Sequence, residues 1–195
     1  VRSMAGITGA EAAERILRQS GIYDVRIEHI SGNLTDHYDP SNKVLRLSDS
    51  VYGSTSVAAI GVAAHECGHA VQHQVGYAPL SIRSALVPVA NFGSSLSWPI
   101  FVAGLIFSIG PLLDIGIILF LAAVLFQVVT LPVEFNASAR AIRLLDSCGI
   151  LGQQEIGGTK KVLTAAALTS VASLAASILQ LLRLLILAGG RRRND

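Results

Sequence analysis

SVAAIGVAAHECGHAVQHQVG, residues 56–76, is the stretch around which the rest of the chain is organised. Its alanine-rich flanks predict a helix, and the helix carries the pattern H-E-x-x-H at His65, Glu66 and His69. The helical repeat places residues four apart on one face with about 6 Å of rise between them, so two imidazoles can share one Zn²⁺. Glu66 is one step round the helix from His65, where it can reach a water on the metal but not the metal itself.

Zinc chemistry explains why these residue types occur at this spacing. Zinc lowers the pKa of a bound water to about 7, and a neighbouring carboxylate takes the proton as the water attacks a carbonyl carbon. The pattern therefore predicts one catalytic zinc ion, with His65 and His69 as ligands and Glu66 as the general base. A helix with two ordinary histidines is the simpler alternative. Chance rarely produces the pattern, because the chain has only five histidines.

The composition divides the chain into a polar first part and an apolar second part. Of its 195 residues, 51% are hydrophobic and 14% are charged, whereas a soluble globular protein carries about 25% charged residues. The net charge of +2 is too small to indicate nucleic acid as a partner. Cys67 and Cys148 show no metal-binding or redox spacing. One domain with added membrane segments fits this length.

Residues 1–83 are expected to form a zincin-like α+β part with a small antiparallel sheet and the H-E-x-x-H helix. Thr8 and Glu11 have the spacing of a capping box and predict a short helix, which Gly21 is placed to end. Alternating apolar residues and turn signals predict three strands, at residues 23–30, 34–38 and 44–47.

Long uncharged runs dominate the second half of the chain. Residues 84–113 and 115–133 contain no charged residue, and each run can supply the roughly 20 apolar residues needed to cross a bilayer. Gly110 and Pro111 beside Asp114 indicate a tight reversal, so residues 84–133 are predicted to form a transmembrane hairpin. Such a hairpin returns the chain to the side that it left, beside the zinc helix.

Glu134 is the predicted third zinc ligand. It directly follows the hairpin, and a catalytic zinc site holds three protein ligands and one open position. Asp146 and Glu155 remain alternatives, because the sequence does not exclude either carboxylate.

Other histidines are weaker candidates for the third ligand. His73 lies on roughly the same helix face as His65, but about 12 Å of helix separates the two residues. The metzincin pattern, with its third histidine past a glycine turn, is absent. Gln72 and Val75 stand where that pattern would place its glycine and its last histidine.

The last third of the chain is predicted to contain a third-ligand helix and loop at 134–160, a membrane or membrane-packed helix at 161–190, and a basic tail at 191–195. Basic residues flank the hairpin on the side of the site, and the positive-inside rule makes that side cytoplasmic. A third crossing would place the tail outside, against the same rule. The segment 161–190 therefore either spans the bilayer or packs against the hairpin.

Five motifs spread along nearly the whole chain, GITGAEAAERIL, LTDHYDP, KVLRLS, AAHECGHAVQH and LPVEFNASARA, resemble those of a known family. The family is the neutral zinc metallopeptidases of bacterial membranes, the YugP-like group of gluzincins, which is distantly similar to the HtpX-like and CAAX-prenyl endopeptidases. The resemblance implies a mainly helical, multi-pass protein of the bacterial plasma membrane. It also implies that His65, His69 and Glu134 bind zinc and that Glu66 is the catalytic base. The more distant relatives usually carry an aspartate where this chain has Ser138.

Four further side chains are candidates for stabilising the transition state or supporting the zinc ligands: His37, Asn136, Ser138 and Arg140. His37 lies in the predicted hairpin directly before the zinc helix. In zincins a strand at this place often forms the edge to which an extended peptide adds as a further strand. Capping, surface or ordinary strand roles are the alternatives for all four residues.

Two functions from different classes agree with these observations. The first is a membrane-bound zinc endopeptidase that acts on peptide or protein substrates beside the lipid bilayer. The second is a non-catalytic membrane adaptor whose zinc site is structural or vestigial. The presence of Glu66 favours the peptidase, because a structural zinc site has no use for a base beside an open position.

Overall fold

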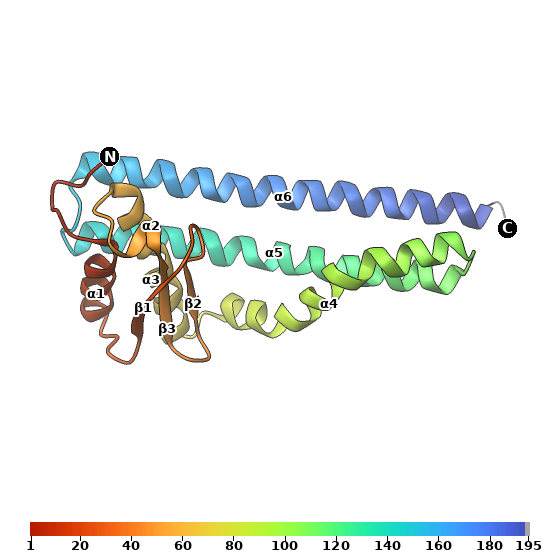
Figure 1. Cartoon of the computed structure of the whole chain (residues 1–195), viewed down its shortest axis with the longest axis horizontal. Coiled ribbons are helices and arrows are strands. Elements are labelled where there is room, and N and C mark those ends of the chain that lie inside the picture. The colour runs from red at the N-terminus through yellow and green to blue at the C-terminus, as the bar shows by residue number, and fades with distance from the viewer. Residues whose placement is uncertain (194–195) are drawn as a thin grey trace. The chain divides into compact units, whose positions relative to one another are not determined.

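The computed structural model describes residues 1–193 and is mainly helical (Figure 1). Its elements in chain order are α1 (Gly9–Gln19), β1 (Arg26–Ile30), β2 (His37–Asp39), β3 (Val44–Ser48), α2 (Asp49–Tyr52), α3 (Val57–Gln74), α4 (Ala78–Ile106), α5 (Gly110–Ser147) and α6 (Gln153–Arg193). They form two compact units. The sheet unit contains Val1–Leu80 and Val133–Leu168, and the helical unit contains Ser81–Pro132 and, among the described residues, 169–193.

The first helix begins and ends as its sequence predicts. The Thr8 side chain accepts a hydrogen bond from the backbone N–H of Glu11 at 3.1 Å, which satisfies one of the free donors at the helix start. Gly21 follows the helix with a φ of +73°, a conformation that glycine adopts without strain. The buried face of α1 joins α3 in the core of the sheet unit.

The three strands form one sheet in the order β1-β3-β2. β2 and β3 form the expected antiparallel hairpin, with Tyr38 opposite Leu45. β1 runs parallel to β3, with Ile27 opposite the same leucine, so the sheet is mixed and not antiparallel as expected. β3 carries the most buried side chains and takes the central place. Because β1 and β2 run in opposite directions on either side of it, one of them must be parallel to β3.

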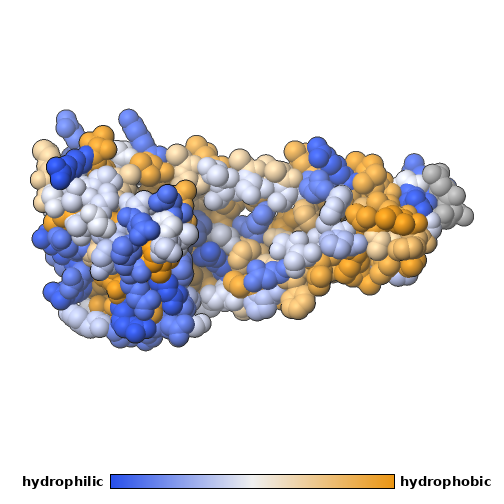
Figure 2. All heavy atoms as spheres, in the orientation of Figure 1, coloured by the Kyte–Doolittle hydropathy of each residue, from blue (hydrophilic) through white to orange (hydrophobic). Residues whose placement is uncertain are grey.

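The helical unit contains the most apolar segments. Three helices, α4, α5 and α6, are long and apolar enough to cross a membrane among the residues that the structure describes. Phe101, Leu113 and Leu184 are buried together where the three helices meet. Large hydrophobic side chains also point outward, for example Phe92 and Ile186, and hydrophobic residues gather toward the α4–α5 turn on the visible face in Figure 2. Lipid is the solvent that suits such a surface.

The helix that carries Glu134 does not begin near that residue, as the sequence suggested. α5 runs without a break from Gly110 to Ser147, with Pro132 inside it. A proline removes one backbone hydrogen bond, but the helix can continue through it where the residues on both sides keep their helical conformation. α6 likewise covers the segment 161–190 and extends to Arg193. The remainder of the basic tail, residues 194–195, lies outside the described residues.

Candidate metal centre

His65 and His69 of α3 meet Glu134 of α5 in the sheet unit. Nε2 of His65 lies 2.8 Å from Oε2 of Glu134, and Nε2 of His69 lies 3.3 Å from the other carboxylate oxygen. One ligand atom from each residue lies within 4.8 Å of the other two. The two imidazole rings are nearly perpendicular, with an interplanar angle of 86°. The three side chains therefore converge from two helices on one point.

This geometry fits a zinc ion. Zinc binds imidazole nitrogen at about 2.0–2.1 Å and carboxylate oxygen at about 2.0–2.2 Å, and tetrahedral bonds of that length separate the ligand atoms by roughly 3.4 Å. The separations of 2.8 and 3.3 Å involve different oxygens of Glu134, and one ligand atom from each residue lies within 4.8 Å of the other two, so small shifts of the side chains would accommodate the ion. Two nitrogens and one oxygen form a donor set that zinc prefers in catalytic sites.

Ser138 supports the first imidazole. Its Oγ lies 2.9 Å from Nδ1 of His65. The tautomer that carries its proton on Nδ1 donates to this hydroxyl and leaves the lone pair of Nε2 free for a metal. Ser138 lies one helical turn after Glu134, so a single segment of α5 supplies both the carboxylate and the support for His65.

Gln72 supports the second imidazole. Its side chain is fully buried, and its Oε1 lies 3.0 Å from Nδ1 of His69. Its Nε2 donates to the carbonyl of Val133 at 2.9 Å and to Oδ1 of Asn136 at 3.0 Å. The amide is thus held at both ends, which fixes the orientation of the His69 ring. In the sequence Gln72 served only to exclude the metzincin pattern. The sequence did contain a signal for its role as a support of His69, because it is a polar residue three positions after His69 in an apolar helix.

Asn136 and Arg140 extend this network along α5. Oδ1 of Asn136 accepts a second hydrogen bond, from Nε of Arg140, at 2.8 Å. The guanidinium of Arg140 lies 5.8 Å from the centre of the Tyr77 ring, within the range of a cation–π contact. Both residues were candidates in the sequence, and the structure connects them to His69 through Gln72.

Comparison with known proteins identifies a family of zinc metallopeptidases. The model of the family described as "Putative neutral zinc metallopeptidase" matches residues 1–189. The chain belongs to this family. It is also 49% identical over 195 residues to "Putative membrane protease YugP" from Bacillus subtilis (strain 168), an alignment that covers 100% of this chain and 87% of the relative. No solved structure matches the chain.

The residues between the two motif histidines differ in their surroundings. Glu66 is buried, with 8% of its surface exposed. Cys67 is fully buried, and its Sγ contacts the carbonyl oxygen of Ala13 at 3.7 Å. Burial raises the pKa of the Cys67 thiol above its ordinary value, and Cys67 is not part of the cluster of possible ligands found among the described residues. This agrees with its position on the opposite side of the helix from His65.

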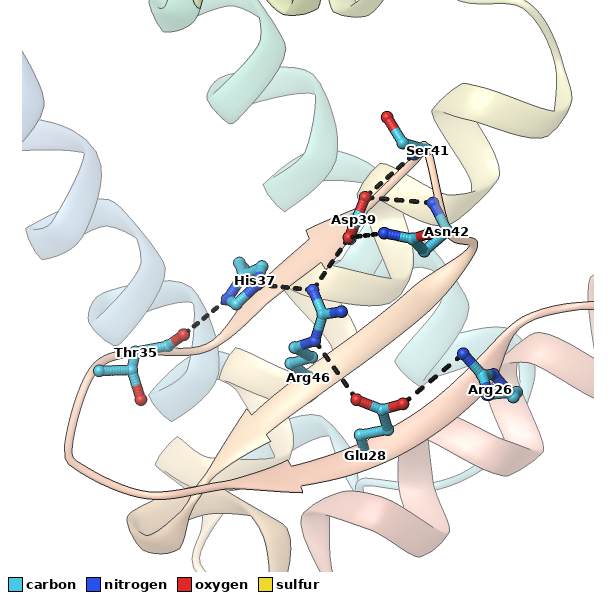
Figure 3. A network of polar contacts seen from close by, with 8 residues as sticks. All are labelled: Arg26, Glu28, Thr35, His37, Asp39, Ser41, Asn42 and Arg46. Carbon is cyan, nitrogen blue, oxygen red and sulfur yellow. Dashed lines mark hydrogen bonds and ion pairs between the residues drawn. The ribbon is translucent and has the colours of Figure 1, made fainter. Parts of the chain in front are cut away.

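His37 does not lie at the candidate metal centre. It lies on the polar face of the sheet, where its Nε2 contacts Nη1 of Arg46 at 3.2 Å and its Nδ1 contacts the carbonyl of Thr35 at 2.8 Å (Figure 3). Arg46 also donates to Asp39 at 3.0 Å. Hydrogen bonds from Asn42 and Arg46 lower the pKa of Asp39 to about 2, although burial opposes the shift. This network stabilises the hairpin and occupies both ring nitrogens of His37.

The alternative metal ligands also have other partners. Nδ1 of His73 lies 2.7 Å from the phenol oxygen of Tyr38, which links α3 to β2, and burial raises the pKa of Tyr38 to about 12. Asp146 accepts a hydrogen bond from Gln153 at 3.0 Å. Glu155 accepts hydrogen bonds from two backbone N–H groups in loop regions. None of the three alternatives belongs to the cluster found among the described residues.

Gly68 allows α3 and α5 to approach each other closely. A Cβ added at this position would lie 2.5 Å from the carbonyl oxygen of Ala137, which is far inside contact distance. Ala137 lies between Glu134 and Ser138 on α5, so this contact sets how far both side chains are from His65. A glycine within the H-E-x-x-H pattern is therefore part of the geometry of the centre.

Gly68→Ala is expected to separate the two helices at the metal centre. The clash is with backbone, which cannot rotate away, and overpacking of this kind costs about 1–3 kcal/mol. We expect lower thermal stability in detergent and at least about tenfold weaker zinc binding, because Glu134 moves with its helix. Gly157→Ala is the matched control, since a Cβ there meets nothing within 4 Å. Equal zinc affinity in the two variants would contradict the role given to this contact.

Proposed function

We propose that this protein is a membrane-embedded, zinc-dependent endopeptidase that hydrolyses peptide bonds. His65, His69 and Glu134 hold one catalytic zinc ion, and Glu66 is the general base. The observation that carries the proposal is the convergence of the three ligand atoms together with the engagement of both histidine Nδ1 atoms by neutral partners. Both Nε2 atoms are thereby left to face one point.

The residues of the chain have distinct roles in the proposed reaction. When bound, zinc supplies the Lewis acidity that polarises a scissile carbonyl and lowers the pKa of water to about 7. Glu66 takes the proton of the attacking water and passes it to the leaving amine. Ser138 and Gln72 hold the two imidazoles in orientation and tautomer.

The proposed substrate is an extended stretch of peptide. β2 lies at one edge of the sheet and contacts α3 through Tyr38 and His73. An extended peptide can add to such an edge by backbone hydrogen bonds, which recognise shape and direction more than side-chain identity. Unfolded proteins or flexible termini present such segments.

The proposed location is the plasma membrane of a bacterium, with the metal centre on the cytoplasmic side. Three helices of suitable length and hydropathy support insertion in the bilayer. Lysine and arginine residues at the site's end of the apolar runs support the orientation under the positive-inside rule: Arg83, Arg140, Arg143, Lys160 and Lys161. The arginines at 191–193, at the other end of α6, count against it.

Removal and return of zinc test the proposal. The protein purified in detergent is expected to contain one zinc ion per chain and to cleave an unfolded protein such as reduced casein. A chelator that strips the metal should abolish cleavage, and stoichiometric zinc should restore it, because the ion is part of the reaction. Metal content is measured by mass spectrometry and cleavage by the appearance of new amino termini. Zinc-loaded protein that cleaves no unfolded substrate would instead support a non-catalytic adaptor.

A further inference from the structure

A small apolar cavity lies between α5 and α6 within the sheet unit. Its volume is about 220 Å³. Phe135, Ala139 and Ile142 line it from α5, and Leu163 and Leu168 line it from α6. Leu163 is buried and forms part of the core, whereas Phe135 and Leu168 are exposed at 48% and 62%. The cavity therefore has a fixed base and an open rim.

The cavity shares one residue with the surroundings of His65. Ser138 lines the cavity and also lies 2.9 Å from Nδ1 of His65. Phe135 follows Glu134 directly in the helix. At 100° per residue, the lining residues of α5 are about a quarter turn round the helix from Glu134.

The size and chemistry of the cavity select for a large apolar group. An engineered cavity of about 150 Å³ in an apolar protein interior binds benzene, so a cavity of about 220 Å³ holds the side chain of leucine, methionine or phenylalanine. Lys160 is the one charged residue among the described residues that line it. Its ammonium group opposes the entry of a lysine or arginine side chain, because like charges repel at short distance.

We propose that this cavity is the specificity pocket of the peptidase and that it takes a large apolar side chain next to the scissile bond. This proposal rests on the proposed function and adds the class of substrate. It predicts cleavage beside leucine, methionine or phenylalanine, with little cleavage where alanine, lysine or arginine takes the same place. Burial of such a side chain is worth about 1.5–3 kcal/mol, which corresponds to roughly a 10- to 150-fold preference over a small one.

Filling the cavity tests its role. In Ala139→Leu the added side chain takes part of the volume, so the ratio of kcat/KM for a leucine peptide over an alanine peptide should fall at least about tenfold. Ala58→Leu makes the same change at an exposed position of α3 that does not line the cavity, and it should keep the wild-type ratio. Cleavage sites in an unfolded protein, mapped by mass spectrometry for all three proteins, show which side of the bond the pocket serves.

A second variant widens the cavity and covers the case in which Ala139→Leu does not fold. Leu168 is exposed, so Leu168→Ala should be tolerated, and its cleavage profile should shift toward the largest aromatic side chains. If both variants fold and both keep the wild-type cleavage profile, the proposal is wrong. The cavity would then be a site for a lipid or detergent chain and not for a substrate side chain. Failure of the proposed function itself looks different, because the wild-type protein would then cleave no peptide at all.

Discussion

Glu66→Gln is expected to lower kcat/KM for peptide hydrolysis by about 10³-fold while zinc stays bound. General acid–base catalysis contributes about 10²- to 10⁴-fold, and an amide cannot take the proton of the attacking water. The change keeps the size of the side chain, and Glu66 is not one of the three residues whose ligand atoms converge. The variant should therefore lose the proton transfer and keep the zinc ion.

Glu14→Gln is the matched control for this variant. Glu14 forms an exposed ion pair with Arg18 on α1, at 2.6 Å, and takes no part in the metal centre. Loss of this ion pair should leave both zinc content and cleavage unchanged, because exposed ion pairs contribute about 0–1 kcal/mol to stability. Cleavage is followed with a quenched fluorescent peptide, and zinc is determined on the same samples. Full activity in the Glu66 variant would exclude it as the base.

Glu134→Ala is expected to weaken zinc binding by more than about 100-fold and to abolish cleavage. Loss of groups that merely support a zinc ligand costs about 10- to 100-fold in affinity, so loss of a ligand should cost more. The carboxylate contacts both histidines and comes from another helix, so no other acidic group of the described cluster replaces it. Affinity is measured by competition with a coloured zinc chelator.

His73→Ala distinguishes this assignment from the main alternative. His73 lies on the same helix as the motif histidines but contacts Tyr38 and not the cluster. Its removal should leave zinc affinity within about twofold of the wild type. The opposite pattern, with normal affinity in Glu134→Ala and loss in His73→Ala, would refute the ligand set.

The helices and the site residues were predictable to different degrees. The H-E-x-x-H spacing places two histidines on one face of any helix, so His65 and His69 required no tertiary information. Glu134 lies 69 residues from His65 in sequence. It was reached by a topological argument, in which two apolar runs fold back on each other. That argument selected the carboxylate that the structure places beside both histidines, although it placed a helix boundary where α5 continues.

Other features depend on contacts that a sequence pattern does not encode. The parallel pairing of β1 with β3 is not encoded in the residue alternation, because the alternation is the same for either strand direction. His37 lies on the polar face because of the register of β2 and β3, where a shift of one residue would reverse it. Gln72 gains its role only when α5 brings Val133 and Asn136 against it.

The hydroxyl and amide behind the two imidazoles have a consequence for the charge balance of the centre. Ser138 and Gln72 are neutral, whereas an aspartate in place of Ser138 would bring another negative charge close to the ligands. With two neutral imidazoles and one carboxylate as its proposed ligands, a bound divalent cation would keep one unit of positive charge. A more positive centre stabilises hydroxide relative to water. Neutral supports at Ser138 and Gln72 would therefore weaken the attraction for the cation and would favour loss of a proton from a bound water.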